Sequence, residues 1–303
     1  MPIEVKQLSK LYGTQYAVDN ISFTVNKGEI VGFLGPNGAG KSTTMKILTS
    51  FIPPSEGGAS ICGFDVEQSP YEVKKRIGYL PENNPLYTDM YVKEYLQFVA
   101  RVQGLGRNGK EKVKEMIEVT GLEVEQKKKI GQLSKGYRQR VGLAQAMIHN
   151  PEVLILDEPT TGLDPNQLAD IRQLISRLGQ EKTVLLSTHI MQEVQAMCSR
   201  VIIINRGNIV ADDRTQNLQQ SANRQLYTVE YNKAIDVQKL ADYLGETEIE
   251  SFGENTYRIY SEKAEDKRPM LFNFAVENGL ILLALNREES SLEEVFRELT
   301  GGA

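Results

Sequence analysis

The residues with the clearest chemical meaning lie in one short glycine-rich segment, GPNGAGKST. Its glycines allow backbone amides to approach phosphate oxygens closely, Lys41 adds a positive charge, and Ser42 offers a hydroxyl oxygen to Mg²⁺. This spacing predicts a loop that binds the β- and γ-phosphates of a nucleotide; the alternative is a tight glycine turn with an incidental lysine. The residues expected to bind the nucleotide are Gly35, Pro36, Asn37, Gly38, Ala39, Gly40, Lys41, Ser42 and Thr43.

A second segment, VLILDEPT, places two acidic residues directly after an apolar run. If the run is a strand of a parallel sheet, Asp157 and Glu158 reach the carboxyl edge of that sheet, beside the phosphate loop. Asp157 is then expected to hold Mg²⁺ through water or Ser42, and Glu158 to accept a proton from an attacking water. The alternative is a pair of acids at a solvated strand end.

The segment LSKGYRQR, residues 133–140, reads as the start of a helix. The first amides of a helix have no partner within it, and the helix dipole favours a negative charge there. This start is therefore a second candidate anion site, well separated in sequence from the phosphate loop. The alternative is a basic helix for which Ser134 is simply the N-cap.

These residues need elements that position them. Strand-like runs alternate with helical patterns up to about residue 215, which predicts an α/β unit with a parallel sheet and helices packed on it. Residues of about 83–150 are expected to form a helical subdomain. A polar, Gln- and Asn-rich stretch at 216–224 is expected to link this unit to residues 225–303, whose pattern predicts a small α+β domain of ferredoxin-like arrangement.

Composition excludes several classes of protein. The net charge of −5 gives no electrostatic footprint for nucleic acid. Two distant cysteines without metal-ligand spacing indicate reduced thiols. The N-terminus lacks the pattern of a signal peptide, and no apolar run is long enough to span a bilayer. A membrane role is therefore expected to act through a partner.

Taken in order, the phosphate loop, LSKGYRQR, LILDEPT, GLDP and STH resemble the motifs of the ATP-binding cassette (ABC) family of transport ATPases. The resemblance covers residues 1 to about 215. The whole chain is most similar to the ATPase subunits of bacterial exporters with a separate membrane subunit, including the gliding-motility-associated group. The ending SSLEEVFRELTG resembles the tail of that exporter subclass.

The resemblance implies a P-loop NTPase fold of the ABC type and a pair of cassettes that enclose two ATP molecules head to tail. The signature of one cassette would then face the phosphate loop of the other. That signature, which would bind the γ-phosphate held by the partner, comprises Leu133, Ser134, Lys135 and Gly136. Lys135 and Tyr137 depart from the usual Leu-Ser-Gly-Gly-Gln, but the serine and the second glycine are retained.

Other residues carry over from the family one at a time. His189 matches the switch histidine that contacts the γ-phosphate and holds water near Glu158, whereas His149 is expected to be a surface histidine at a helix end. Tyr12 matches the aromatic residue that stacks on adenine, with a core or surface tyrosine as the alternative.

Asp164 resembles the loop aspartate that links the two sites of the dimer. Glu82 stands where the family usually has glutamine; as a carboxylate it can still bind Mg²⁺. The family docks its membrane subunits on the helical block after Glu82, where Tyr87, Met90 and Tyr91 are candidates for the socket; packing within that block is the alternative.

The sequence thus predicts an ATPase that dimerises around ATP and Mg²⁺ and drives an integral membrane permease, as an exporter of unidentified substrate. Such a subunit would lie peripherally on the cytoplasmic face of the inner membrane and be cytoplasmic when isolated. Nucleic acid is not an expected partner. Two alternatives stay open: a regulator or scaffold of an envelope complex, gliding machinery included, and a soluble ABC ATPase without a transport role.

Overall fold

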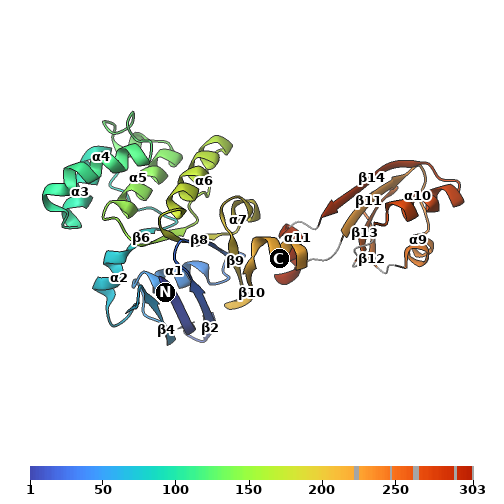
Figure 1. Cartoon of the computed structure of the whole chain (residues 1–303), viewed down its shortest axis with the longest axis horizontal. Coiled ribbons are helices and arrows are strands. Elements are labelled where there is room, and N and C mark those ends of the chain that lie inside the picture. Colours follow the sequence, from blue (N-terminus) through green and yellow to red (C-terminus); the bar gives the residue numbers. More distant parts are fainter. Residues whose placement is uncertain (222–224, 246–247, 262–265, 290–291, 302–303) are drawn as a thin grey trace. The chain divides into compact units, whose positions relative to one another are not determined.

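The computed structural model describes residues 1–221, 225–245, 248–261, 266–289 and 292–301. The chain divides after Arg214 into two compact units (Figure 1). The first, residues 1–214, is called the cassette unit below, and the second, which begins at Thr215, the C-terminal unit. Their hydrophobic clusters share no residue, so each unit has a core of its own.

One sheet of the cassette unit is antiparallel, with strand order β2-β1-β4-β5. Its strands are β1 (Ile3–Tyr12), β2 (Gln15–Val25), β4 (Glu56–Ile61) and β5 (Phe64–Asp65). Along β2, buried and exposed side chains alternate near the C-terminal end of the strand. That alternation matches the period of two in the sequence, because one face of the sheet covers the core.

The second sheet has strand order β10-β9-β3-β8-β7-β6, and all of its pairs are parallel except β9 with β10. Its strands are β3 (Ile30–Leu34), β6 (Ile77–Leu80), β7 (Val153–Asp157), β8 (Thr183–Thr188), β9 (Arg200–Asn205) and β10 (Asn208–Arg214). Strands β7 and β8 are buried at every position. This explains their unbroken apolar runs, because a parallel sheet is covered on both faces.

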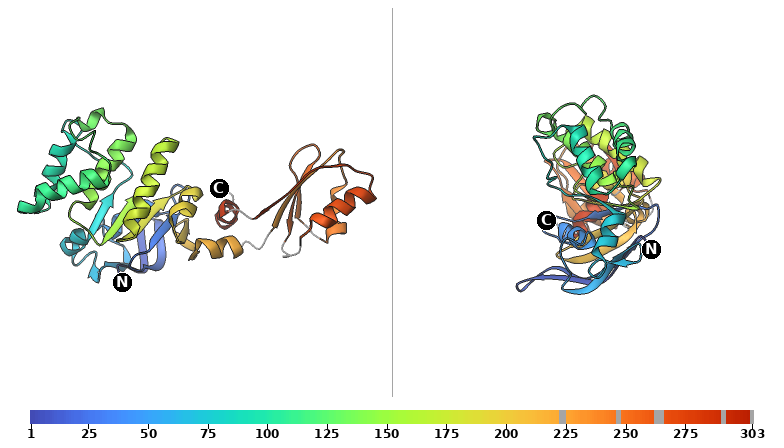
Figure 2. Two further views of the ribbon diagram at one scale, coloured as in Figure 1. Left: turned by 45° about the horizontal axis from the view of Figure 1, so that its top comes forward. Right: turned by 90° about the vertical axis from the view of Figure 1, so that its left-hand side faces the viewer.

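Helices cover these sheets and form a separate block. The helices of the cassette unit are α1 (Lys41–Leu48), α2 (Pro70–Arg76), α3 (Val92–Val102), α4 (Gly109–Val119), α5 (Lys135–Met147), α6 (Pro165–Gly179) and α7 (Met191–Met197), with short 3₁₀ turns η1 (Gly106–Asn108) and η2 (Ile130–Gln132). The green helices α3, α4 and α5 lie together at one end of the unit in both views of Figure 2. They are the helical subdomain that the sequence predicts.

The core of the cassette unit lies around α1, between the two sheets. Met45 of α1 belongs to the same buried cluster as side chains from both sheets. Phe23 of β2 and Phe33 of β3 join the sheets directly, with ring centroids 5.5 Å apart. Because α1 is held from both sides, the loop before it has a fixed position relative to the ends of β7 and β8.

The C-terminal unit contains the ferredoxin-like arrangement that the sequence predicts. Its antiparallel sheet has the order β12-β13-β11-β14, with the chain alternating strand and helix as β-α-β-β-α-β. The elements are β11 (Gln225–Tyr231), α9 (Val237–Leu244), β12 (Glu248–Ser251), β13 (Thr256–Ser261), α10 (Arg268–Glu277) and β14 (Leu282–Glu289). Tyr227, Tyr231 and Phe274 form the centre of its core.

Two further helices flank this arrangement. Helix α8 (Thr215–Ser221) occupies most of the segment that the sequence predicts as a linker, of which residues 222–224 lie outside the described part. Its TQNLQQ sequence is polar and contains no helix breaker, so this part of the connection is helical. Helix α11 (Leu292–Leu299) contacts α8.

Candidate functional site

The phosphate loop lies between the end of β3 and the start of α1, as the sequence predicts. Gly40 has φ of 112°, a backbone conformation that only glycine adopts readily. A Cβ atom on Gly40 would lie 2.4 Å from the carbonyl oxygen of Ala17, and a Cβ atom on Gly35 would lie 2.3 Å from that of Ile204. Two of the loop's glycines are therefore required by close backbone contacts, independently of any ligand.

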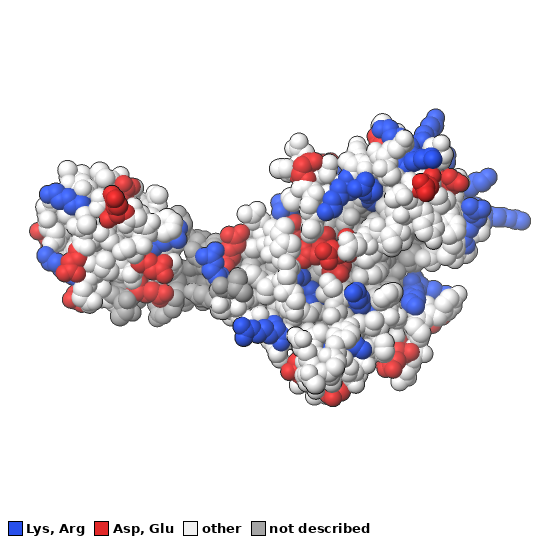
Figure 3. All heavy atoms as spheres, turned by 180° about the vertical axis from the view of Figure 1, so that it is seen from behind, with Lys and Arg blue, Asp and Glu red and all other residues white. Residues whose placement is uncertain are grey.

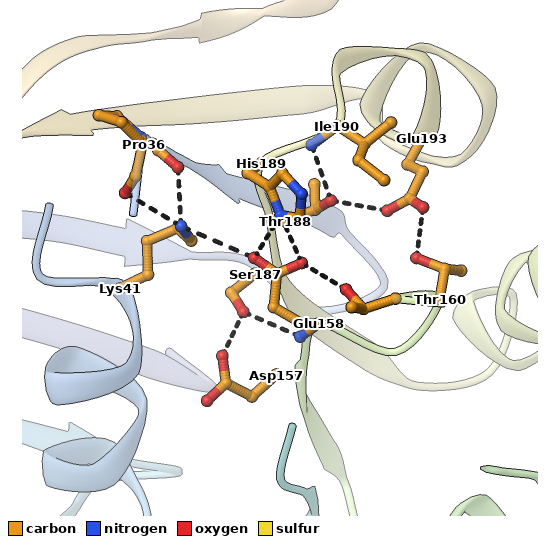
Figure 4. A network of polar contacts seen from close by, with 12 residues as sticks. Pro36, Lys41, Asp157, Glu158, Thr160, Ser187, Thr188, His189, Ile190 and Glu193 are labelled. Carbon is orange, nitrogen blue, oxygen red and sulfur yellow. Dashed lines mark hydrogen bonds and ion pairs between the residues drawn. The ribbon is translucent and has the colours of Figure 1, made fainter. Parts of the chain in front are cut away.

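Lys41 points back into this loop. Its Nζ donates to the carbonyl oxygens of Gly35 at 2.7 Å and Pro36 at 3.2 Å, and lies 3.6 Å from Oε1 of Glu158 (Figure 4). Burial lowers the pKa of Lys41, while the charges of Glu158 and Asp157 act in the opposite direction. The lysine is thus a buried cation held between backbone carbonyls and a carboxylate.

Asp157 ends β7 and faces the first turn of α1. The hydroxyl of Ser42 donates to Oδ1 of Asp157 at 3.3 Å, and the hydroxyl of Ser187 on β8 donates to the same oxygen. Ser187 Oγ also accepts from the backbone N–H of Glu158 at 3.1 Å. The ends of β7 and β8 are thereby joined, so the two acidic residues have defined positions relative to the phosphate loop.

Glu158 and His189 lie in direct contact. Nδ1 of His189 is 2.9 Å from Oε2 and 3.0 Å from Oε1 of Glu158, and the Thr161 hydroxyl donates to Oε2 at 2.9 Å. Figure 4 shows the carboxylate of Glu158 between Lys41 and His189. The side chain of Glu158 is only 7% exposed, whereas that of His189 is 42% exposed. The backbone of Glu158 has φ of 51°, an uncommon conformation for a residue with a side chain.

These side chains surround a cavity of about 560 Å³, large enough for a nucleotide's phosphates. Glu82 also lines the cavity. Only the family resemblance pointed to this residue, because it lies about forty residues after the phosphate loop in the sequence. The residues that line the cavity are Ala17, Asn37, Gly38, Gly40, Lys41, Ser42, Thr43, Glu82, Glu158, Thr161 and His189.

Several residues that the sequence predicts for the site lie outside the lining of this cavity. Tyr12 ends β1 and is 52% exposed, with the amine of Lys10 over its ring at 5.5 Å from the centroid. Ser134 is the N-cap of α5, and its hydroxyl accepts from the N–H of Tyr137 at 3.3 Å. A Cβ atom on Gly136 would lie 2.5 Å from Oε1 of Gln167 on α6. Gly136 thus lies beside α6, and none of Leu133, Ser134, Lys135 and Gly136 lines the phosphate-loop cavity of this chain.

Asp164 is the N-cap of α6, where Oδ1 accepts from the N–H of Gln167 at 2.9 Å. Lys135 approaches this loop as well, because a Cβ atom on Gly162 would lie 2.3 Å from Nζ of Lys135. The candidate signature and the loop of Asp164 are therefore neighbours within one chain.

Sequence reasoning missed three residues of the site. Ser187 and Thr161 contact the acidic residues, and their hydroxyls in STH and EPTT were the available signal. Ala17 lines the cavity through β2, and its side chain carries no chemical signal at all. Ser187 and Thr161 lie at or just after the ends of β8 and β7, whereas Ala17 comes from the other sheet, whose approach to the phosphate loop the sequence pattern does not show.

A second hollow, of about 480 Å³, lies beside the helical subdomain and is lined mainly by apolar and aromatic side chains. Tyr87 lines it, whereas Met90 and Tyr91 do not. His149 also lines it and is half-buried: its Nε2 lies 2.9 Å from the carbonyl oxygen of Ile77, and burial lowers its pKa, so its position at a helix end does not stabilise the charged form as the prediction of a surface histidine implied. The chain folds α5 back onto β6, so the end of that helix is covered.

None of the helices in the described residues combines the length and the apolar character that crossing a membrane requires. The same residues contain no group of three or more His, Cys, Asp or Glu side chains with the arrangement of a metal site.

Comparisons with known proteins agree with this geometry. The ABC transporter family model matches residues 18–161. Over 304 residues the chain is 35% identical to the bacitracin transport ATP-binding protein BcrA of Bacillus licheniformis. The aligned segment covers 99% of this chain and 97% of that relative. The chain is 36% identical over 305 residues to the Nod factor export ATP-binding protein I of Burkholderia pseudomallei (strain K96243), with 99% and 97% covered.

A solved structure is similar as well. It is the dimeric structure of a post-hydrolysis state of the ATP-binding cassette MJ0796 bound to ADP and Pi, with a TM-score of 0.64 and 25% identity, covering 70% of this chain and 98% of that one. A phosphate loop with a lysine, facing carboxylates that can hold a metal ion and orient water, provides the positioning and charge stabilisation on which ATP hydrolysis depends. The chain therefore belongs to the ABC transporter family, as an ATP-binding subunit with ATPase activity.

Proposed function

We propose that Glu158 is the general base of this ATPase and that the chain is the motor subunit of an exporter. The observation that carries the proposal is the position of the Glu158 carboxylate, between Lys41 and His189 at the edge of the phosphate-loop cavity. A carboxylate so placed accepts a proton from water that attacks the γ-phosphate. His189 orients this carboxylate and the water, and Lys41 neutralises charge on the transferred phosphoryl group.

The residues present fit a magnesium ion. Ser42 and Asp157 offer hard oxygen ligands that already lie 3.3 Å apart, and Glu82 adds a carboxylate to the same cavity. The described residues do not complete a metal site alone, so the remaining ligands would be water and phosphate oxygens. A Mg²⁺ ion held there by Ser42, Asp157 and Glu82 would offset the negative charge of the nucleotide's phosphates.

The active form that we propose is a homodimer, or a pair with another ABC ATPase. Helix α5 is 13 residues long, and its N-cap Ser134 does not line the phosphate-loop cavity of its own chain. In a head-to-tail pair this helix start would face the partner's γ-phosphate, with Leu133 and Lys135 beside it and Asp164 near the contact. The similar MJ0796 structure is described as dimeric, which supports this arrangement.

The membrane partner that we propose docks in the hollow beside the helical subdomain. Phe51, Tyr87 and Val102 line it and are each more than half exposed, which is unusual for large apolar side chains on a protein without a partner. An amphipathic helix from a permease has the chemistry to cover them. The chain would then lie peripherally on the cytoplasmic face of the cell membrane.

The proposal of export, rather than uptake, is supported by the similarity to the Nod factor export ATP-binding protein I. On the face that Figure 3 shows, Lys and Arg side chains over the helical subdomain are interspersed with Asp and Glu. Such a surface gives no continuous basic stripe, which is why we do not propose nucleic acid as a partner. A place in an envelope or gliding machinery rests on the closing sequence segment and stays a prediction.

The test uses Glu158→Gln, with Glu152→Gln as the control because Glu152 is an exposed carboxylate just before the same strand. Glu158→Gln is expected to lower phosphate release about 10²- to 10⁴-fold while ATP still binds. Light scattering with Mg-ATP is then expected to show a dimer for Glu158→Gln. Release at the wild-type rate would remove Glu158 from the role of base, and a persistent monomer with ATP bound would remove the shared site.

A further inference from the structure

A buried carboxylate lies close to Glu158 and His189 and is hydrogen-bonded to neither of them. Glu193, in the first turn of α7, is 0% exposed. The hydroxyl of Thr160 donates to its Oε1, and the hydroxyl of Thr188 donates to its Oε2 at 2.6 Å (Figure 4). Among the residues that the structure describes, no Lys, Arg or His forms an ion pair with Glu193. Burying a carboxylate costs free energy, and here two hydroxyl donors and the N-terminal turn of α7 offset that cost.

The two threonines belong to the two loops that carry the catalytic groups. Thr160 follows Glu158 by two residues, and Thr188 directly precedes His189. The Thr188 hydroxyl also accepts from the N–H of Ile190 at 3.0 Å, so it determines the turn in which His189 lies. One oxygen of Glu193 therefore holds the loop after β7, and the other holds the loop after β8.

The contact between Glu158 and His189 needs such support. The backbone of Glu158 has φ of 51°, and a residue in that region persists only where its surroundings hold it. His189 is partly exposed, and the only described polar partners of its ring are the oxygens of Glu158. Without a fixed distance between the two loops, the 2.9 Å contact would be one of several arrangements.

We propose that Glu193 is a positioning residue for ATP hydrolysis, which acts by holding Thr160 and Thr188 and through them the Glu158–His189 pair. This inference rests on the proposed roles of Glu158 and His189. It assigns a function to a carboxylate that is not among the residues that line the cavity. It also gives a role to a carboxylate on a buried helix face, a place usually occupied by apolar side chains.

The experiment compares variants of the full chain that remove one hydroxyl or one charge. Thr188→Val and Thr160→Val keep the side-chain shape but lose the bond to Glu193, and Thr188→Ser restores a hydroxyl. Glu193→Gln keeps the shape of the carboxylate and removes its charge. Thr120→Val is the matched control: Thr120 is equally buried, and its hydroxyl donates to the carbonyl of Met116 at 2.6 Å in the helical subdomain.

We expect kcat to fall roughly 10- to 100-fold in Glu193→Gln and Thr188→Val, because displacing a catalytic group by about 1 Å costs about that much. KM and the affinity for a fluorescent ATP analogue are expected to stay within about twofold, since the phosphate loop is untouched. Thr188→Ser is expected to recover most of the activity. If Glu193→Gln does not fold, the two threonine variants carry the test alone.

Two results would overturn the proposal. If kcat in Thr188→Val and Thr160→Val equals that of Thr120→Val, the bonds to Glu193 serve stability only. If kcat is unchanged and the loss of kcat/KM comes entirely from a higher KM, the network acts on nucleotide binding instead. Glu158→Gln is measured alongside: turnover retained there would refute the catalytic role of Glu158 itself, whereas turnover lost there but kept in Thr188→Val would refute the role of Glu193 alone.

Discussion

Replacing Gly40 by alanine tests whether the phosphate loop is held by the antiparallel sheet beside it. The new Cβ atom would lie 2.4 Å from the carbonyl oxygen of Ala17 on β2, 3.2 Å from Cδ1 of Ile204 and 3.4 Å from Cγ2 of Val18. The first of these atoms belongs to the backbone, so relief requires β2 or the loop itself to move. Gly38 is the matched control, because it has φ of 80° but no atom within 4 Å of its added Cβ.

The two variants separate backbone strain from steric contact. Alanine at a positive φ costs about 1–2 kcal/mol, which is the whole effect expected for Gly38→Ala. Gly40→Ala adds an overpacking cost of about 1–3 kcal/mol. For a unit of roughly 200 residues, each kcal/mol shifts the melting temperature by about 2–4 °C. We therefore expect a loss of a few degrees for Gly38→Ala and on the order of 10 °C for Gly40→Ala.

Calorimetry of the full chain measures both variants. The transition of the cassette unit is the one that ATP shifts upward, because a ligand stabilises the part that binds it. Gly40→Ala is also expected to bind a fluorescent ATP analogue more weakly than Gly38→Ala, since the displaced loop no longer aims its amides together. Equal melting temperatures for the two variants would refute the reasoning, because they would show that the backbone at Ala17 moves away from the added Cβ atom without loss of stability.

Three further predictions follow from buried or capping groups. Burial lowers the pKa of His149 below its ordinary 6.5, so the unfolded chain takes up a proton at a higher pH than the folded chain. The free energy of unfolding should therefore be unaffected by His149 above pH 6.5 and fall as the pH falls below it. His149→Gln should flatten this dependence, measured by urea unfolding between about pH 7.5 and 5. Asp164→Ala should cost about 1 kcal/mol through loss of the α6 cap, whereas Asp164→Ser should keep stability, so ATPase loss in the serine variant alone would assign Asp164 a role beyond capping. Arg200 donates to both carboxylate oxygens of Asp212 at 2.7 and 2.8 Å, so Arg200→Lys should lower the free energy of unfolding of the cassette unit by about 1–2 kcal/mol. Arg268→Lys is the control, because Arg268 pairs with Asp266 in the C-terminal unit and its replacement should leave the thermal transition of the cassette unit unchanged.

The sequence predicted the parts of the site that depend on local chemistry. A glycine-rich turn, a lysine and a helix start must lie together because they are consecutive, and a buried strand ending in Asp157 and Glu158 must reach the same sheet edge as β3. The helical subdomain and the ferredoxin-like order were likewise readable from periodicity.

The parts that sequence could not supply depend on packing between distant segments. Nothing near Glu193 in the sequence shows that its carboxylate is buried or that two threonines from separate loops donate to it. The burial of His149 depends on a carbonyl 72 residues earlier in the chain. Polar composition indicated a linker at residues 216–224, but it did not show that helix α8 forms there, because composition reports hydrophobicity and not backbone conformation.

The position of β3 at the centre of its sheet has a consequence for the growing chain on the ribosome. Its sequence, IVGFL, pairs with β8 on one side and β9 on the other, and those strands begin only at Thr183 and Arg200. At about 5–20 residues per second, translation takes roughly 10–30 s to deliver both neighbours. During that time an apolar, β-prone segment has no partner strand, which makes it a target for chaperones and a source of aggregation when synthesis is fast and crowded.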